Sequence, residues 1–377
     1  MADRVLVHLG TPKSGTTYLQ QLMWSRRGAL ARAGVSVPGW APDAAFLACQ
    51  DLLRVEFNEW PDPAVAGSWA RLVTLVRRAP GTAVVSHELF GDADADVAAR
   101  ALADLTGGGA AEVHLAVTVR DLARQLPAVW QEDVKNRHTL PYRDFLAAVS
   151  AAVPTAATPT AAEPGPPVSS WQGAAFWHRQ DVPAVLRRWA ADLPPERVHV
   201  VVVPPRGSAP DLLWQRFARV LGVDPDVAPP PAEAVNRSLG VVESELLRRL
   251  NDRLGGRVPW PVYAERVTHH LAPHVLAARS GRPLALPAGD HPWVSERASA
   301  LAGQLAGAGY RVVGDLRELT VPPLPPAARP GDGPASEGEL LDAALDALAG
   351  LVGTGSADGA PQLQRRVARR LARLVER

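Results

Sequence analysis

The stretch VLVHLGTPKSGTTYLQQLM, residues 5–23, decides the fold expected for this chain. Its first five residues are apolar except for one histidine, and Gly-Thr-Pro at 10–12 ends that run. From Thr16 onward, apolar side chains recur every three or four residues, as on one face of a helix. The stretch therefore predicts a buried strand, a short loop and a helix in succession.

Three later segments have the same character as the first strand. They are rich in valine and leucine, each precedes a segment with a helical pattern, and they occupy residues 82–86, 112–119 and 198–203. Near-continuous apolar strands that alternate with helices are typical of a parallel sheet covered on both faces. The fold class expected is therefore α/β, with a parallel sheet flanked by helices.

Composition along the chain suggests how it is divided. With 377 residues, 47% of them hydrophobic, it is long enough for one large α/β domain, expected over residues 1–320. An Ala-, Pro- and Thr-rich stretch at about 147–170 is expected to be a variable insertion, and residues 321–335 a proline-rich linker. A Ser-x-x-Glu capping pattern at Ser336 predicts that residues 336–377 form a helical C-terminal extension.

The charge balance narrows the classes of partner. Lys and Arg together number 40 against 39 for Asp and Glu, a net charge of +1. Proteins that coat nucleic acid or an acidic membrane depend on a strong basic excess, so neither partner is expected. The single cysteine, Cys49, cannot form an intrachain disulfide, and neither a secretion signal nor an apolar run of roughly 18 residues is evident. The expected location is the cytoplasm.

The loop at residues 10–17, GTPKSGTT, is the most specific feature of the sequence. A loop between a strand and a helix presents backbone N–H groups to an anion, and the helix dipole adds positive potential. Gly10 and Gly15 have the spacing of a nucleotide triphosphatase loop, but in that loop a lysine directly follows the second glycine. Here Thr16 takes that place and Lys13 precedes Gly15. Lys13 is one of only two lysines among 40 basic residues.

The segment TPKSGTT at 11–17 resembles the sulfotransferase family that uses 3'-phosphoadenosine 5'-phosphosulfate (PAPS), whose members carry a P-K-S-G-T-T loop after the first strand. The resemblance implies a nucleotide-binding fold of the P-loop type. It implies that Lys13 contacts the bridging oxygen and the transferred sulfuryl group, while loop amides, Thr16 and Thr17 hold the 5'-phosphate. The cofactor-binding residues it implies in this loop are Pro12, Lys13, Ser14, Gly15, Thr16 and Thr17.

The family's second cofactor element is a strand that runs into an arginine, with a serine eight residues later, and both bind the 3'-phosphate. Here the strand ends at Arg120, and Arg124 lies one helical turn further on. A guanidinium suits bidentate binding of phosphate, so both arginines are expected to bind the cofactor. The position of the serine holds Ala128, so the hydroxyl contact is absent or comes from elsewhere. The resemblance is strong over the first third of the chain and weaker at 236–240.

Sulfuryl transfer also needs a base for the proton of the acceptor. Residues 86–88, Ser-His-Glu, follow the second strand at the carboxyl edge, where open α/β sheets bind ligands. A free histidine has a pKa of about 6.5 and a free glutamate one of about 4.3, and the family uses either residue. Adjacent strand residues point to opposite faces, so His87 and Glu88 are not both expected in the cleft. We favour Glu88.

Three other histidines, His8, His114 and His199, lie inside apolar strand patterns and are expected in the core or at strand edges. The function expected is transfer of a sulfuryl group from PAPS to a hydroxyl or amine of a small molecule, a glycan or a lipid, with no metal. One alternative is a magnesium-dependent P-loop kinase in which Asp121 binds the metal. Another, motivated by Ala128, is a nucleotide-binding homologue without transfer activity.

Overall fold

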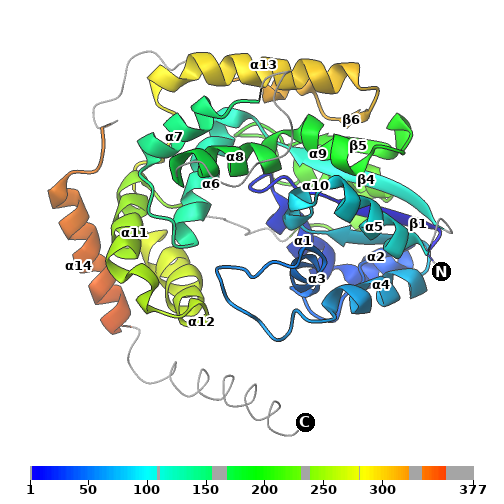
Figure 1. Ribbon diagram of the computed structural model, residues 1–377, viewed down its shortest axis with the longest axis horizontal. Coiled ribbons are helices and arrows are strands. Elements are labelled where there is room, and N and C mark those ends of the chain that lie inside the picture. The colour runs from blue at the N-terminus through cyan, green and yellow to red at the C-terminus, as the bar shows by residue number, and fades with distance from the viewer. Residues whose placement is uncertain are drawn as a thin grey trace, which may run out of the picture. The chain divides into compact units, whose positions relative to one another are not determined.

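A computed structural model describes most of the chain, and two compact units can be distinguished in it (Figure 1). The described residues are 2–107, 111–154, 168–230, 238–279, 281–321 and 333–353. The sheet unit comprises residues 1–130, 142–235 and 285–326. The helical unit comprises residues 131–141, 236–284 and 327–377.

The sheet unit contains six parallel strands in the order β2-β3-β1-β4-β5-β6. Their bounds are β1 Arg4–His8, β2 Val35–Ser36, β3 Thr82–Ser86, β4 Glu112–Val119, β5 Val198–Val202 and β6 Arg311–Val313. The α/β class and the four strands expected from the sequence are confirmed. Sequence periodicity missed β2 and β6 because segments of two and three residues are too short to show a pattern.

Helices connect the strands and cover the sheet. Those of the sheet unit are α1 Thr16–Ser25, α2 Arg27–Arg32, α3 Ala44–Leu53, α4 Ser68–Arg78, α5 Ala95–Thr106, α7 Tyr142–Ala151, α8 Val168–Gln180, α9 Val182–Trp189, α10 Leu212–Leu221 and α13 His291–Gly307. Helix α6, Leu122–Lys135, begins in the sheet unit and ends in the helical unit.

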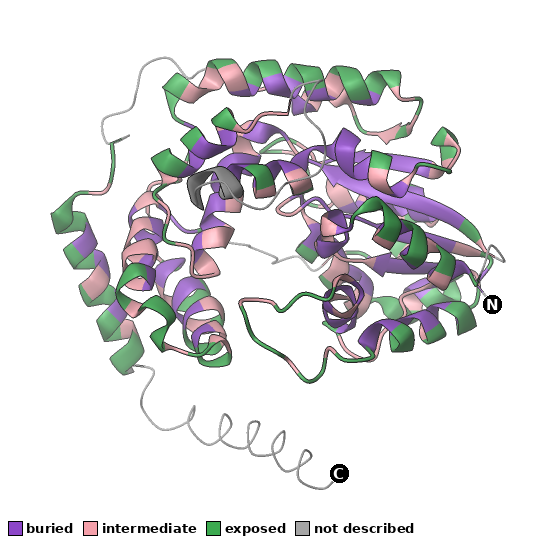
Figure 2. Ribbon diagram, viewed as in Figure 1, coloured by how far each residue is buried: buried purple, intermediate pink, exposed green. Residues whose placement is uncertain are grey.

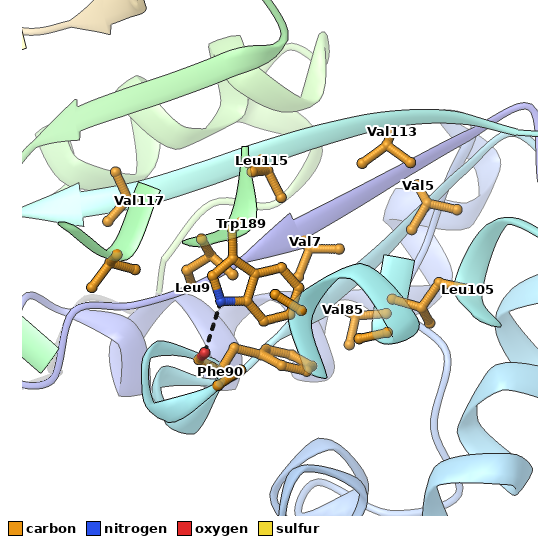
Figure 3. Packing of buried hydrophobic residues seen from close by; sticks show 14 of the residues in the cluster. Val5, Val7, Leu9, Val85, Phe90, Leu105, Val113, Leu115, Val117 and Trp189 are labelled. Carbon is orange, nitrogen blue, oxygen red and sulfur yellow. Dashed lines mark hydrogen bonds between the residues drawn. The ribbon is translucent and has the colours of Figure 1, made fainter. Parts of the chain in front are cut away.

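The strands bury both faces, as their apolar composition requires. Val5 and Val7 of β1 belong to a core shared with α3, α4, α5, α9 and α13, whereas Leu6 belongs to a second core shared with α1, α2 and α10. Burial is continuous along the central strands (Figure 2). In the first core, Trp189 packs among strand side chains and its indole N–H donates to the carbonyl of Phe90 at 2.9 Å (Figure 3).

The strand order changes direction at one point of the sheet. After β1 the chain moves to β2 on one side, whereas after β4 it moves to β5 on the other side. Loops that leave adjacent parallel strands in opposite directions open a crevice at the carboxyl ends of those strands, where open α/β sheets bind ligands. Residues 10–17 follow β1 and Arg120 follows β4, so both meet at this switch point.

The helical unit is built from four main segments, α11 Val241–Leu254, α12 Trp260–Tyr263, the π-helix η5 Ala264–Leu276 and α14 Glu337–Gly353. Ser336 and Glu339 form the expected capping box ahead of α14, because the Ser336 N–H donates to the Glu339 carboxylate at 2.8 Å and the Glu339 N–H donates to the Ser336 hydroxyl at 3.3 Å.

Parts of three expected segments lie outside the described residues. They are the centre of the 147–170 insertion, most of the 321–335 linker and the C-terminal extension beyond residue 353. Residues 236–237, where the resemblance is weaker, also lie outside the described residues. Within the described part of the chain, we find no helix with the length and apolar character that crossing a membrane requires.

Candidate functional site

The loop after β1 adopts a conformation that its glycines permit. Gly10 has φ +94° and Gly15 has φ +86°, both in the region that favours glycine, and Lys13 joins them at φ +62°. A Cβ at Gly10 would lie 2.9 Å from the Cβ of Glu88. Gly10 is therefore needed both for its backbone angle and for the close approach of the Glu88 segment.

Hydrogen bonds to β4 hold this loop. The Thr11 N–H donates to the Thr118 carbonyl at 3.0 Å, and the Thr118 N–H donates to the Gly10 carbonyl at 2.6 Å. The Ser14 hydroxyl is fully buried, donates to the Thr11 carbonyl and contacts the Thr118 hydroxyl, both at 2.5 Å. The side chain of Ser14 thus stabilises the loop by joining its backbone to β4.

A buried histidine lies under the loop and links three strands. His8 of β1 contacts the Ser86 hydroxyl of β3 through Nδ1 at 2.8 Å and the Thr118 hydroxyl of β4 through Nε2 at 3.3 Å. Burial lowers the pKa of His8 to about 4, so the ring is neutral at pH 7. The prediction that His8 is a core residue is confirmed, and its role is to tie β1, β3 and β4 together below the loop.

Helix α1 begins directly after the loop and lacks a side-chain cap. Gly15 is its N-cap residue and supplies no side chain, so none caps the first turn. The first N–H groups of a helix have no partner inside the helix and carry the positive end of its dipole. Of the two threonines here, Thr16 is buried and Thr17 is exposed. The start of α1 has the chemistry of an anion-binding helix N-terminus.

Arg120 and Arg124 lie at the carboxyl end of β4, beside the loop. The Arg120 guanidinium donates to the Lys13 carbonyl at 3.0 Å, and the Arg124 guanidinium donates to the Pro204 carbonyl at 3.0 Å after β5. Arg124 also pairs with the buried carboxylate of Asp121, which accepts the Arg124 backbone N–H at 3.0 Å and so caps α6. The structure brings both predicted arginines to the switch point.

The same arginines retain buried donors. Arg120 Nε and Arg124 Nη2 are buried and have no hydrogen-bond partner in the described chain. Burial and, next in size, the positive charge of Arg124 lower the pKa of Arg120 to about 10. The charge of Arg206 lowers it by a smaller amount, whereas the Asp121 carboxylate acts to raise it. Buried donors without acceptors cost free energy, and three cations face a single carboxylate here. An anion at this place would satisfy the donors and balance the charge.

Glu88 lies on the other side of the loop. Its carboxylate accepts a hydrogen bond from Gln20 Nε2 of α1 at 3.2 Å and another from the Thr16 side chain. Burial acts to raise the pKa of Glu88, but His87 and hydrogen bonds from its own backbone, Gln20 and Thr16 outweigh it and hold the pKa below the usual value. Glu88 is therefore charged at pH 7 and lies against the start of α1.

His87 points away from the loop. Its ring packs on Phe46 of α3 with centroids 5.3 Å apart, and its Nδ1 accepts the Leu89 N–H at 3.1 Å, which caps the 3-10 helix η1, Glu88–Asp92. Because Nδ1 serves as an acceptor, the neutral ring carries its proton on Nε2. Burial lowers the pKa of His87. Both residues lie beyond the end of β3, with His87 as the N-cap of η1 and Glu88 as its first residue, and Glu88 is the one that abuts Gly10.

The residues predicted for the site thus converge, and one partner was missed. Glu88 abuts Gly10, and Arg120 is bonded to the backbone of Lys13, so the three segments at 10–17, 86–88 and 120–124 meet at one end of the sheet. Sequence reasoning missed Gln20, although it lies one helical turn after Thr16, on the same face of α1. Ala128, which stands where the sulfotransferase family has a serine, lies on α6. Besides Arg124, the cation that acts on Arg120 is Arg206.

Comparison of the chain with protein-family models, curated proteins and solved structures finds no match in any of the three.

Proposed function

We propose that this protein is a sulfotransferase that uses PAPS as the sulfuryl donor and a hydroxyl or amine as the acceptor. The fold would then be of the P-loop type, with the loop at 10–17 and the start of α1 on the 5'-phosphosulfate and Arg120 with Arg124 on the 3'-phosphate. The observation that carries the proposal is the pair of buried, unsatisfied arginine donors at the switch point, beside a loop that ends in an uncapped helix.

In the proposed reaction, the acceptor oxygen or nitrogen attacks sulfur in line with the S–O bond to the 5'-phosphate. The new bond to sulfur forms as that S–O bond breaks, and 3'-phosphoadenosine 5'-phosphate (PAP) leaves with the bonding electrons. The Glu88 carboxylate, charged at pH 7, takes the acceptor proton. The Lys13 ammonium offsets the negative charge that develops on the leaving oxygen.

The kinase alternative receives less support from the residues around Asp121. A kinase of this type would use that carboxylate as a magnesium ligand. The carboxylate already caps α6 and forms an ion pair with Arg124, so a metal ion would have to compete with a guanidinium for it. The position of Lys13, ahead of the second glycine of the loop, also differs from that of the kinase loop.

Equilibrium binding tests the proposal directly. Calorimetric titration with PAP and with ATP, each in magnesium and in EDTA, is expected to show binding of PAP that EDTA leaves unchanged. Magnesium-dependent binding of ATP with no binding of PAP would favour the kinase.

Incubation with PAPS and a panel of small-molecule, glycan and lipid acceptors, followed by mass spectrometry, then separates an active enzyme from an inactive homologue. The active enzyme adds one sulfuryl group to an acceptor. PAP binding with no sulfated product would indicate the nucleotide-binding homologue. The cytoplasm, where PAPS would be the available donor, remains the proposed location.

A further inference from the structure

The corner between α8 and α9 contacts the loop that carries Lys13. Gln180, the last residue of α8, is buried, and its side-chain amide donates to the Pro12 carbonyl at 3.1 Å. Gln125 of α6, also buried, donates to the same carbonyl and to Gln180 Oε1, the latter at 3.0 Å. The Pro12 carbonyl belongs to the peptide group that immediately precedes Lys13. Two glutamines therefore fix the orientation of that peptide group.

The same corner contacts the segment that carries Glu88. Arg188 of α9 donates to the Gly91 carbonyl at 2.6 Å and to the Ala93 carbonyl at 2.9 Å, at the end of η1. Trp189 donates to the Phe90 carbonyl at 2.9 Å. Three backbone carbonyls after Glu88, at positions 90, 91 and 93, thus accept hydrogen bonds from the last two residues of α9.

The corner itself is held in place. Arg188 donates to the His178 carbonyl at 2.8 Å, which joins α9 to α8. Asp181, between the two helices, accepts the Ala184 N–H at 3.3 Å as the N-cap of α9 and pairs with Arg297 of α13 at 3.0 Å. Buried ion pairs that cap a helix limit its freedom to shift. The corner is therefore a firm support for both segments.

We propose that Gln180 and Arg188 are positioning residues that set the separation between the Lys13 ammonium and the Glu88 carboxylate. The inference rests on the proposed function and adds to it two residues whose side chains donate hydrogen bonds to the backbone of the two segments. In-line transfer requires the cation and the base to stand at a fixed spacing across the reacting atoms, and a misplacement of about 1 Å can lower a rate about 100-fold.

The first test compares Gln180→Leu with a matched control, Gln131→Leu. Gln131 is also a buried glutamine whose amide donates to a backbone carbonyl, that of Leu239 at 2.7 Å in the helical unit. Both variants lose one such bond, so similar falls in melting temperature are expected. Only Gln180→Leu is expected to lower kcat, by about tenfold or more, with KM for PAPS little changed. Equal kcat in the two variants overturns the positioning role.

A second variant supplies a pH signature that a merely structural role would not produce. In Gln180→Glu, an ionised carboxylate has no proton to donate to the Pro12 carbonyl, whereas the protonated acid has one. The kcat of this variant, divided by that of the wild type at the same pH, is expected to rise as the pH falls from 7 to 5. A ratio that does not change with pH overturns the proposal.

Amide hydrogen exchange separates failure of this inference from failure of the proposed function. Gln180→Leu is expected to speed exchange at the amides of 11–17, and Arg188→Ala at those of 89–93, while Arg188→Lys restores protection in part. Unchanged exchange in both segments overturns the positioning role even in an active enzyme. If wild-type protein neither binds PAP nor transfers a sulfuryl group, the proposed function fails, and the exchange rates still decide whether the corner holds the two segments.

Discussion

The Arg120 guanidinium donates a hydrogen bond to the backbone carbonyl of Lys13 at 3.0 Å, across 107 residues of sequence. One end of this contact lies after β4 and the other lies in the loop after β1. This bond uses Nη1, and the buried Nε has no hydrogen-bond partner in the described part of the chain. In the proposed function, one side chain would therefore contact both the 3'-phosphate and the backbone of the loop that carries Lys13.

Replacement of Arg120 by alanine is expected to weaken PAP binding much more than binding of adenosine 5'-phosphate. Hydrogen bonds to charged groups contribute about 1.5–3 kcal/mol each, so a loss of about 10- to 100-fold in affinity for PAP is expected. Isothermal titration calorimetry measures both ligands. Arg219→Ala, an exposed arginine on α10, is the control. Equal losses for the two nucleotides would show that Arg120 does not bind the 3'-phosphate.

Replacement of Lys13 by alanine is expected to lower kcat by about 100- to 1,000-fold, the usual effect of removing one donor that stabilises developing charge. KM for PAPS should change far less, because in the proposed mechanism the ammonium would act on the leaving oxygen in the transition state. Steady-state kinetics with a sulfated product as readout measures both. Lys135→Ala removes the other lysine of the chain and is the control. A nearly normal rate for Lys13→Ala would reject the mechanism.

The base is expected to be Glu88, and the pH dependence should follow its lowered pKa. Its pKa is held below 4.5, so the carboxylate accepts a proton throughout the neutral range and loses that ability only when acid protonates it. Activity should therefore stay level as pH falls to about 5 and decline below that. Glu88→Gln is expected to lower kcat by about 100-fold or more, and His87→Ala by much less. The reverse order would assign the base to His87.

The stability of the sheet unit is expected to fall in acid because of His8. Its pKa is about 4 in the folded protein, against 6.5 for the unfolded side chain. Between these values the unfolded chain takes up a proton that the folded chain does not, so stability is complete above pH 6.5 and is lost as pH falls toward 4. The loss amounts to about 3 kcal/mol for a shift of this size.

Thermal unfolding followed at several pH values measures this effect. His8→Gln retains a side chain that can bond Ser86 and Thr118 but does not titrate, so its unfolding should depend less on pH. Part of the dependence that remains is expected from His199, whose pKa burial also lowers to about 4. An identical pH dependence in wild type and His8→Gln would contradict the assignment.

The sequence by itself determined the α/β class, the four longer strands and the loop at 10–17. Each of these is a local pattern: runs of valine that bury both faces, and glycines at two positions that need positive φ.

Only the tertiary structure decided which distant residues act together. The strand order that makes β1 and β4 neighbours, the bond from Arg120 to Lys13, and the glutamines of α6 and α8 on the Pro12 carbonyl join segments more than 100 residues apart. Contacts of this range arise when the sheet and its two cores assemble, and a buried glutamine within a helix has no local pattern that reveals its partner. For that reason the loop could be found in the sequence, but what holds it could not.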